Sequence, residues 1–142
     1  MIVFLVLLVI NFFIFHTTKE PHELVEVKEK YQRLREHLSD TNNEKFKVLS
    51  RPIPITGLKR MRNSVGYNVN KGAEIAVCLD GTANEIFHVL IHELAHSTVS
   101  DYSHSEEFWQ NYNELRDICI HLGIYTLIPD KTEFCGQHIQ DK

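Results

Sequence analysis

Residues 92–96 of the chain read HELAH, and this spacing can build a metal centre together with its own base. On an α-helix of 3.6 residues per turn, His92 and His96 lie on one face and can share a Zn²⁺ ion. Glu93 is rotated by about 100° from His92, so its carboxylate lies beside the metal. There it can take a proton from a zinc-bound water and pass it to a leaving amine. The pattern predicts hydrolysis of peptide bonds with Glu93 as the general base.

A catalytic zinc site uses three protein ligands and keeps one position open. His104 follows His96 after a polar stretch, STVSDYS, which is expected to end the first helix and turn the chain. Ser103 and Glu106 match a capping box, which places His104 at the start of a second helix. The positive end of that helix disfavours an imidazolium, so His104 stays neutral, as a metal ligand must. We predict that His92, His96 and His104 bind the zinc.

The remaining histidines are predicted to play lesser parts. His88 lies one turn before His92 on the same helical face, where lining the cleft is favoured over ligation. The alternative from another class is an inactive, structural zinc-binding protein at a membrane or in a virion. Three histidine ligands and an intact Glu93 favour catalysis over that alternative. The histidines without an identifiable partner are predicted to lie on the surface: His16, His22, His37, His121 and His138.

Three helices are predicted to position these side chains. Thr82 and Glu85 form a capping box that starts the HELAH helix. The next helix continues to about His121 and stops at Gly123. Another helix is expected over residues 20–39. The apolar stripes of the three helices are, in chain order, Leu24, Val27, Tyr31, Leu34 and Leu38; Phe87, Leu90, Ile91 and Leu94; and Phe108, Tyr112, Leu115, Cys119 and Leu122.

The segment between the first of these helices and HELAH is predicted to form β-structure with turns. VGYNV is typical of a strand, and Asn70, Lys71 and Gly72 after it are typical of a turn. Residues 74–79, EIAVCL, form a mostly apolar strand that leads into the HELAH helix. We expect a substrate peptide to add to this strand by main-chain pairing.

The N-terminus differs from the rest of the chain, because residues 1–15 are apolar except for Asn11. Such a run is borderline for a membrane span, and it has neither a basic start nor an A-x-A cleavage site. We therefore predict a membrane anchor over residues 1–18 and a catalytic domain over residues 19–142. Basic residues after the run favour a cytoplasmic catalytic domain. Secretion after signal cleavage is the alternative.

Net charge excludes a protein that binds nucleic acid through its overall field, since the 142 residues carry a charge of −4. Basic residues are nevertheless concentrated in segment 45–71, which has no acidic residue. A solvated basic loop is the simpler interpretation, and a face that attracts phosphate groups is the alternative. The basic residues are Lys45, Lys47, Arg51, Lys59, Arg60, Arg62 and Lys71.

The cysteines argue against a disulfide framework. Cys78, Cys119 and Cys135 are odd in number, far apart, and form no C-x-x-C pair. We predict reduced, partly buried thiols that take no part in metal binding.

Three blocks of the sequence together resemble the WLM family of zinc metallopeptidases, relatives of the SprT-like and Spartan proteases. The blocks are NKGAEIAVCL, LIHELAHS and HSEEFW, and the resemblance covers about residues 45–122. The spacer between His96 and His104 is longer than is typical of that family. The matching residues are Asn70, Gly72, Glu74 and Ile75; His92, Glu93, Leu94 and His96; and His104, Phe108 and Trp109.

The resemblance implies an α+β, minimal zincin-like fold. In such a fold a small mixed sheet with an edge strand packs on the H-E-x-x-H helix, and a following helix brings the third ligand. It also implies peptidase activity on protein or peptide substrates with zinc as the cofactor. In well-known members of the family, the substrates are proteins crosslinked to DNA. The resemblance therefore implies an alternative function, a DNA-dependent protease that acts on DNA–protein crosslinks and binds nucleic acid through segment 45–71.

Overall fold

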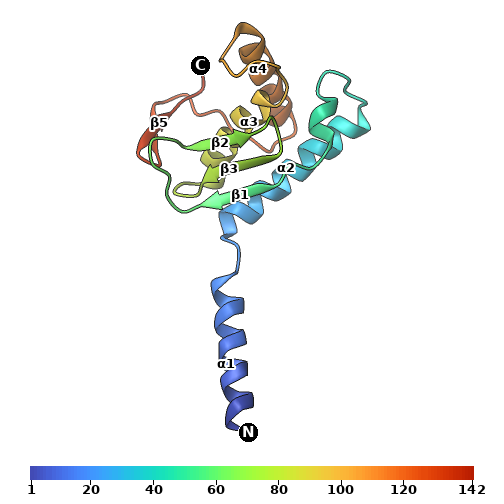
Figure 1. Ribbon diagram of the computed structural model, residues 1–142. Helices are drawn as coiled ribbons and strands as arrows, with labels where there is room; N and C mark the ends of the chain where they lie inside the picture. The colour runs from blue at the N-terminus through green and yellow to red at the C-terminus, as the bar shows by residue number, and fades with distance from the viewer.

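The helix that carries HELAH, α3 (Ala83–His96), lies at the centre of the fold (Figure 1). In the computed structural model, which describes residues 1–142, α3 packs against two helices and two strands. The architecture is α+β, with a small mixed sheet packed on the HELAH helix, as predicted. The other elements are α1 (Ile2–Thr17), α2 (His22–Asp40), the 3-10 helix η1 (Lys47–Ser50), β1 (Ile55–Leu58), β2 (Gly66–Val69), β3 (Glu74–Cys78), α4 (Glu106–His121), β4 (Thr132–Phe134) and β5 (Gln137–Ile139).

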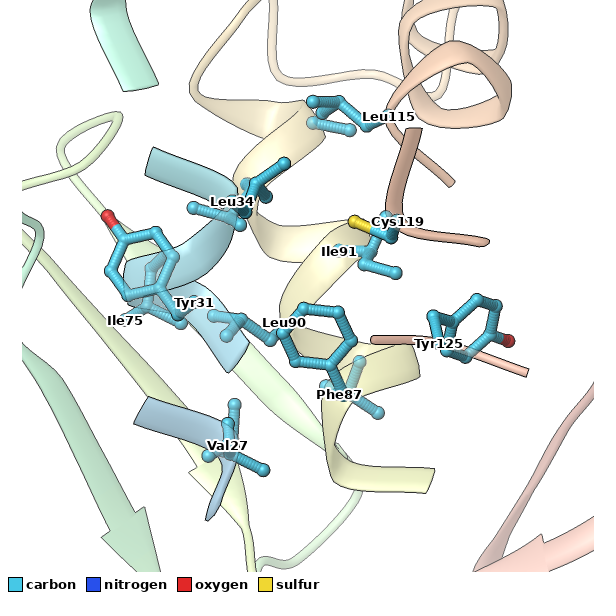
Figure 2. Packing of buried hydrophobic residues seen from close by; sticks show 14 of the residues in the cluster. Val27, Tyr31, Leu34, Ile75, Phe87, Leu90, Ile91, Leu115, Cys119 and Tyr125 are labelled. Carbon is cyan, nitrogen blue, oxygen red and sulfur yellow. The ribbon is translucent and has the colours of Figure 1, made fainter. Parts of the chain in front are cut away.

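The start of α3 is the predicted capping box. The Thr82 hydroxyl accepts from the Glu85 amide at 3.2 Å, and the Glu85 carboxylate accepts from the Thr82 amide at 2.9 Å. Both bonds satisfy amides that the helix leaves free at its first turn. The predicted apolar face is fully buried, and Figure 2 shows part of it against α2 and α4. Its members are Phe87, Leu90, Ile91 and Leu94.

The main sheet has three strands in the order β1-β3-β2, so β3 is the central strand. It pairs with β1 in parallel and with β2 in antiparallel orientation. The prediction that a substrate strand adds to residues 74–79 is therefore wrong. Both edges of β3 are already hydrogen-bonded, and the free edge next to α3 belongs to β2.

Helix α2 buries the predicted stripe and holds the irregular stretch that follows it. The helix begins at His22, with Pro21 at its cap. The Tyr31 hydroxyl accepts from the amide of Ile53 at 3.0 Å, inside the stretch that contains Pro52. The buried stripe is the predicted one: Leu24, Val27, Tyr31, Leu34 and Leu38.

Helix α4 begins later than the sequence pattern indicates. Its cap is Ser105, whose hydroxyl accepts from the Phe108 amide at 3.2 Å. The predicted capping box of Ser103 and Glu106 does not form, and His104 lies in the loop before the helix. The reason is that Ser105 is the serine whose hydroxyl reaches an unsatisfied amide of the first turn. The helix ends at His121, ahead of Gly123 with its positive φ of 70°, as predicted.

Helix α1 projects away from the rest of the fold, and all of its residues are exposed (Figure 1). By length and apolarity, no single helix of the chain qualifies as a membrane span. Helices α1 and α2 reach the required length only together, as a pair bent by 58°. The prediction of a transmembrane anchor over residues 1–18 is not supported.

A C-terminal hairpin of β4 and β5 is joined to the main sheet by a disulfide between Cys135 and Cys78. The prediction of reduced thiols is wrong for these two cysteines. Residues with positive φ at the hairpin turn, Cys135 and Gly136, bring the Cys135 Cα to 6.5 Å from that of Cys78, within bridging range. Cys119 is a buried free thiol, as predicted.

Replacing Cys135 with Ser should lower the free energy of unfolding by about 2 to 4 kcal/mol, because the bridge constrains a long loop of the unfolded chain. Urea denaturation followed by tryptophan fluorescence measures the loss. A reductant should weaken the wild type by a similar amount and leave the double variant Cys78→Ser/Cys135→Ser unchanged. Equal sensitivity of both proteins to the reductant would contradict the bridge.

Candidate metal centre

The three predicted ligands come together at the C-terminal half of α3. His104 Nε2 lies 3.0 Å from His92 Nε2 and 3.1 Å from His96 Nε2. One nitrogen from each ring lies within 4.8 Å of the others. A tetrahedral ion with Zn–N bonds of about 2.0 to 2.1 Å holds its ligand nitrogens about 3.3 Å apart. The observed spacing fits such an ion with a slight outward movement of the rings.

Burial keeps the imidazoles of His92 and His96 neutral. Desolvation, helped by the neighbouring His96 and His104, lowers the pKa of His92 to about 3. Desolvation and the nearby His104 also lower the pKa of His96. A neutral imidazole offers a nitrogen lone pair, which a metal ion requires. The chemistry of the donor set therefore fits a metal centre as well as its geometry does.

Two aromatic side chains of α4 hold the ligand rings in place. The Phe108 ring lies 5.0 Å from that of His92 and 4.4 Å from that of His96, measured between ring centroids. The Trp109 ring lies 5.7 Å from that of His104. This packing gives a physical reason for two aromatic residues soon after the third histidine in the sequence.

Glu93 lies next to the ligands in a dry environment. Its residue exposure is 7%, and burial raises the pKa of its carboxyl to about 7. Gly66 of β2 makes room for Val89, the residue one turn before Glu93 on α3, because a Cβ at position 66 would lie only 2.6 Å from Val89 Cγ1. A carboxyl with a pKa near neutrality can both accept and return a proton.

The C-terminal end of α3 is capped by the turn that joins β2 to β3. The Asn68 side-chain amide donates to the carbonyl of Glu93 at 2.7 Å, and its oxygen accepts from the amide of Gly72 at 2.7 Å. The Lys71 ammonium donates to the carbonyl of His96 at 3.1 Å. These bonds satisfy carbonyls that the last turn of a helix leaves free. Sequence reasoning missed Asn68, although a polar residue on the inward-facing side of a strand is a usable signal.

The site opens into a cleft of about 530 Å³ that is lined by four parts of the chain. Strand β2 and the turn before it form one wall, and α3 forms the floor. The loop that carries His104 closes one end. Residues 137–140 of the C-terminal hairpin form the wall that sequence reasoning did not foresee. Nothing in the local sequence of the hairpin indicates that it folds back over α3.

The family model of the WLM domain matches residues 31–141, well over half of the chain. The chain belongs to the WLM domain family. This membership supports a metallopeptidase-like activity, and it agrees with the resemblance found in the sequence blocks.

Relatives of this WLM domain are distant. An uncharacterized protein, R325, of Acanthamoeba polyphaga mimivirus is 35% identical over 85 residues, which covers 53% of this chain and 43% of that protein. The chain thus matches less than half of the relative's length. Wss1 from Saccharomyces cerevisiae has a TM-score of 0.47 at 19% identity, over 68% of this chain and 81% of that one. The metallopeptidase zymogen of Pyrococcus abyssi abylysin has a TM-score of 0.42 at 24% identity, over 68% and 99%.

Other residues of the WLM domain lie around the cleft without joining the ligands. His88 lines the cleft, as predicted, and is not one of the three clustered histidines. His138 is exposed, as predicted, but it also lines the cleft from β5. Tyr102 lies at the rim, where the ammonium of Lys71 stands 4.4 Å from the centre of its ring.

The basic segment 45–71 is partly neutralised by the fold. Lys45 pairs with Glu114, and Lys47 lies 3.9 Å from Glu44. Lys71 is held by the carbonyls at the end of α3. The other four basic residues of the segment are exposed, and all but the first lie in the loop between β1 and β2: Arg51, Lys59, Arg60 and Arg62. A nucleic-acid partner for this WLM domain is therefore not supported.

Replacing Glu93 with Gln should stabilise the metal-free domain at pH 9 by about 3 kcal/mol and change its stability little at pH 5. The pKa of Glu93 is raised to about 7 in the fold from 4.5. The contribution of the protonated Glu93 to the free energy of unfolding is therefore complete below pH 4.5. It is lost as the pH rises through 7, where the buried carboxyl must ionise. Urea denaturation in a chelator at both pH values measures the difference. A pH-independent effect would contradict the buried, neutral state of Glu93.

Proposed function

We propose that this WLM domain is a zinc-dependent metallopeptidase in which His92, His96 and His104 hold the ion and Glu93 is the general base. One observation carries the proposal. Three imidazole nitrogens converge in an open cleft, beside a buried carboxyl whose pKa is raised to about 7. Membership in the WLM domain family supports the same chemistry.

Zinc bound by three histidines lowers the pKa of a coordinated water to about 7 and polarises a carbonyl group. The residues of the chain supply the remaining steps. The Glu93 carboxylate takes the proton of the attacking water, and the resulting carboxylic acid passes that proton to the leaving amine. The low-polarity surroundings that raise the pKa of Glu93 make its carboxylate a stronger base and so favour the uptake of this proton.

The substrate is proposed to lie along the free edge of β2. The amide of Cys78 donates to the carbonyl of Val65 at 2.9 Å. Because peptide groups alternate in direction along an antiparallel strand, the main-chain groups of Gly66 and Asn68 then point away from β3. The Ser64 hydroxyl already bonds the carbonyl of Gly66 at 2.6 Å. The amide and carbonyl of Asn68 are left for an extended peptide, next to Glu93.

A purely structural zinc site is less well supported. The cluster of possible ligands contains three residues, all histidines, so a tetrahedral ion would keep one position open. A structural site normally closes that position with a fourth protein ligand, often cysteine. Two of the three cysteines are instead joined to each other in the disulfide.

Replacing Glu93 with Gln should leave one zinc per chain and reduce hydrolysis of fluorescein-labelled casein by at least about 100-fold, because general-base catalysis contributes about that much. Metal analysis and the rate of fluorescence release are the measurements. Glu29→Gln, an exposed change on α2, is the matched control and should cleave like the wild type. Assays with and without added DNA also test the DNA-dependent alternative. Full activity in the Glu93→Gln variant would refute the assignment.

We further propose that the domain works in an oxidising compartment. The disulfide between Cys78 and Cys135 supports this, because such bonds persist in oxidising surroundings and are rare in the cytosol. Secretion of the domain after signal cleavage fits such surroundings better than the cytoplasmic location expected from the basic residues after the apolar run.

Thiol trapping in producing cells tests the compartment. Acid quenching followed by denaturation and maleimide labelling should modify one cysteine, Cys119, and a prior reduction step should raise the number to three. Labelling of all three cysteines without reduction would place the domain in a reducing compartment.

A further inference from the structure

A buried polar cluster lies one helical turn from the metal centre, and the proposed mechanism does not use it. At its centre is the carboxylate of Asp141, near the C-terminal end of the described chain. Its Oδ1 accepts from the Tyr112 hydroxyl at 3.0 Å, and its Oδ2 accepts from the Tyr125 hydroxyl and, at 2.8 Å, from the Ile128 amide. The fourth member is His88 of α3, which is 8% exposed.

The hydrogen bonds of this cluster fix the tautomer of His88. Its Nδ1 lies 2.8 Å from the Tyr125 oxygen and 3.5 Å from the Tyr112 oxygen. Each tyrosine hydroxyl has one hydrogen, and both hydrogens are donated to Asp141. The two oxygens can therefore only accept a bond from the ring, so His88 Nδ1 carries the proton.

The ring is held neutral as well as oriented. Burial lowers the pKa of His88, and the nearby Asp141 only partly opposes this effect. Burial and the Asp141 carboxylate raise the pKa of both tyrosines, so their hydroxyls keep the hydrogens that Asp141 accepts. A neutral imidazole with Nδ1 protonated has a lone pair on Nε2.

The Nε2 lone pair of His88 is free to meet a ligand. This atom has no hydrogen-bond partner in the chain. The only buried side-chain polar atoms without a partner are Arg35 Nε and Arg116 Nε, so His88 Nε2 is in contact with solvent. The ring lines the main cleft and also a neighbouring cavity of about 420 Å³, bordered by Trp109 and Gln140. Four residues of helix place His88 about 6 Å along α3 from His92.

We propose that His88 is a substrate-binding residue whose Nε2 accepts a hydrogen bond from a main-chain N–H of the peptide, close to the scissile bond. This inference rests on the proposed peptidase function and deepens it. A lone pair needs a donor, and the peptide main chain supplies N–H groups as donors. A cationic group is disfavoured, because the negative charge of Asp141 is already opposed by the Arg116 guanidinium, whose Nη1 lies 3.8 Å from Asp141 Oδ1.

The peptide main chain would thus be held at two places. The edge of β2 offers the main-chain groups of Asn68 on one side of the cleft, and His88 offers an acceptor from the floor. Asp141 and the two tyrosines act only through His88 and are positioning residues. Because they fix one tautomer before the substrate arrives, binding loses little ring freedom.

Ester-for-amide replacement in the substrate tests the hydrogen bond. A casein peptide cleaved by the zinc-loaded full chain is remade with one amide at a time replaced by an ester, sparing the scissile bond. At one position near that bond, the ester should lower kcat/KM of the wild type more than it lowers kcat/KM of the His88→Leu variant. The two losses should differ by about threefold to tenfold. His121→Leu, an exposed change at the end of α4, is the matched control and should show the wild-type loss. An equal loss in wild type and His88→Leu at every position overturns the inference.

A second variant covers the case in which His88→Leu does not fold. Tyr125→Phe removes the nearer acceptor of the Nδ1 hydrogen and should shrink the same ester effect. If the wild type cleaves no peptide, the peptidase proposal fails, and the inference is then judged by ¹⁵N NMR of the histidine rings. A His88 ring protonated on Nδ1, with the Nε2 signal shifting when the peptide binds, supports it. Protonation on Nε2, or an Nε2 signal that does not move with peptide bound, overturns it.

Discussion

The hydrogen bond from the Asn68 side chain to the Glu93 carbonyl fixes the end of α3 against β2, and the whole site depends on that placement. The carbonyls of the last helical turn lack partners, and leaving one buried and unsatisfied costs about 1 to 3 kcal/mol. Asn68 satisfies the carbonyl of Glu93, and its neighbour in the turn, Lys71, satisfies that of His96. Asn68 belongs to β2, the strand that borders the cleft, and Lys71 belongs to the turn that follows it. The proposed base, a proposed ligand and the proposed substrate edge are therefore held by one turn of the chain.

Desolvation acts on the site in two directions. It removes protons from His92 and His96, whose charged forms it penalises, and it keeps a proton on Glu93 for the same reason. A metal-binding set of neutral rings and a carboxyl of raised pKa thus need no opposing charge partners. They need a helix that is anchored by its opposite, apolar face, and that face of α3 is buried in the core.

The C-terminal hairpin completes what α3 and β2 begin. It supplies one wall of the cleft, it is joined to the sheet through the disulfide of Cys78 and Cys135, and the segment after it delivers Asp141 to His88. These contacts link residues more than 50 positions apart. The wall, the bridge and the fixed histidine ring all depend on one late segment of the chain closing over the helix.

Local patterns in the sequence determined the helices, the capping box of α3, its buried face, the turn after β2 and the family. Each depends on residues within a few positions of one another, so the sequence displays it directly. The helix period also aligned His92 and His96, although their role as ligands stays a prediction. Only the tertiary structure decided that β2 and not β3 is the free edge, that Cys78 meets Cys135, and that Asp141 reaches His88. Those outcomes depend on which distant segments pack together, and burial and pairing between distant segments leave no periodic mark on the sequence.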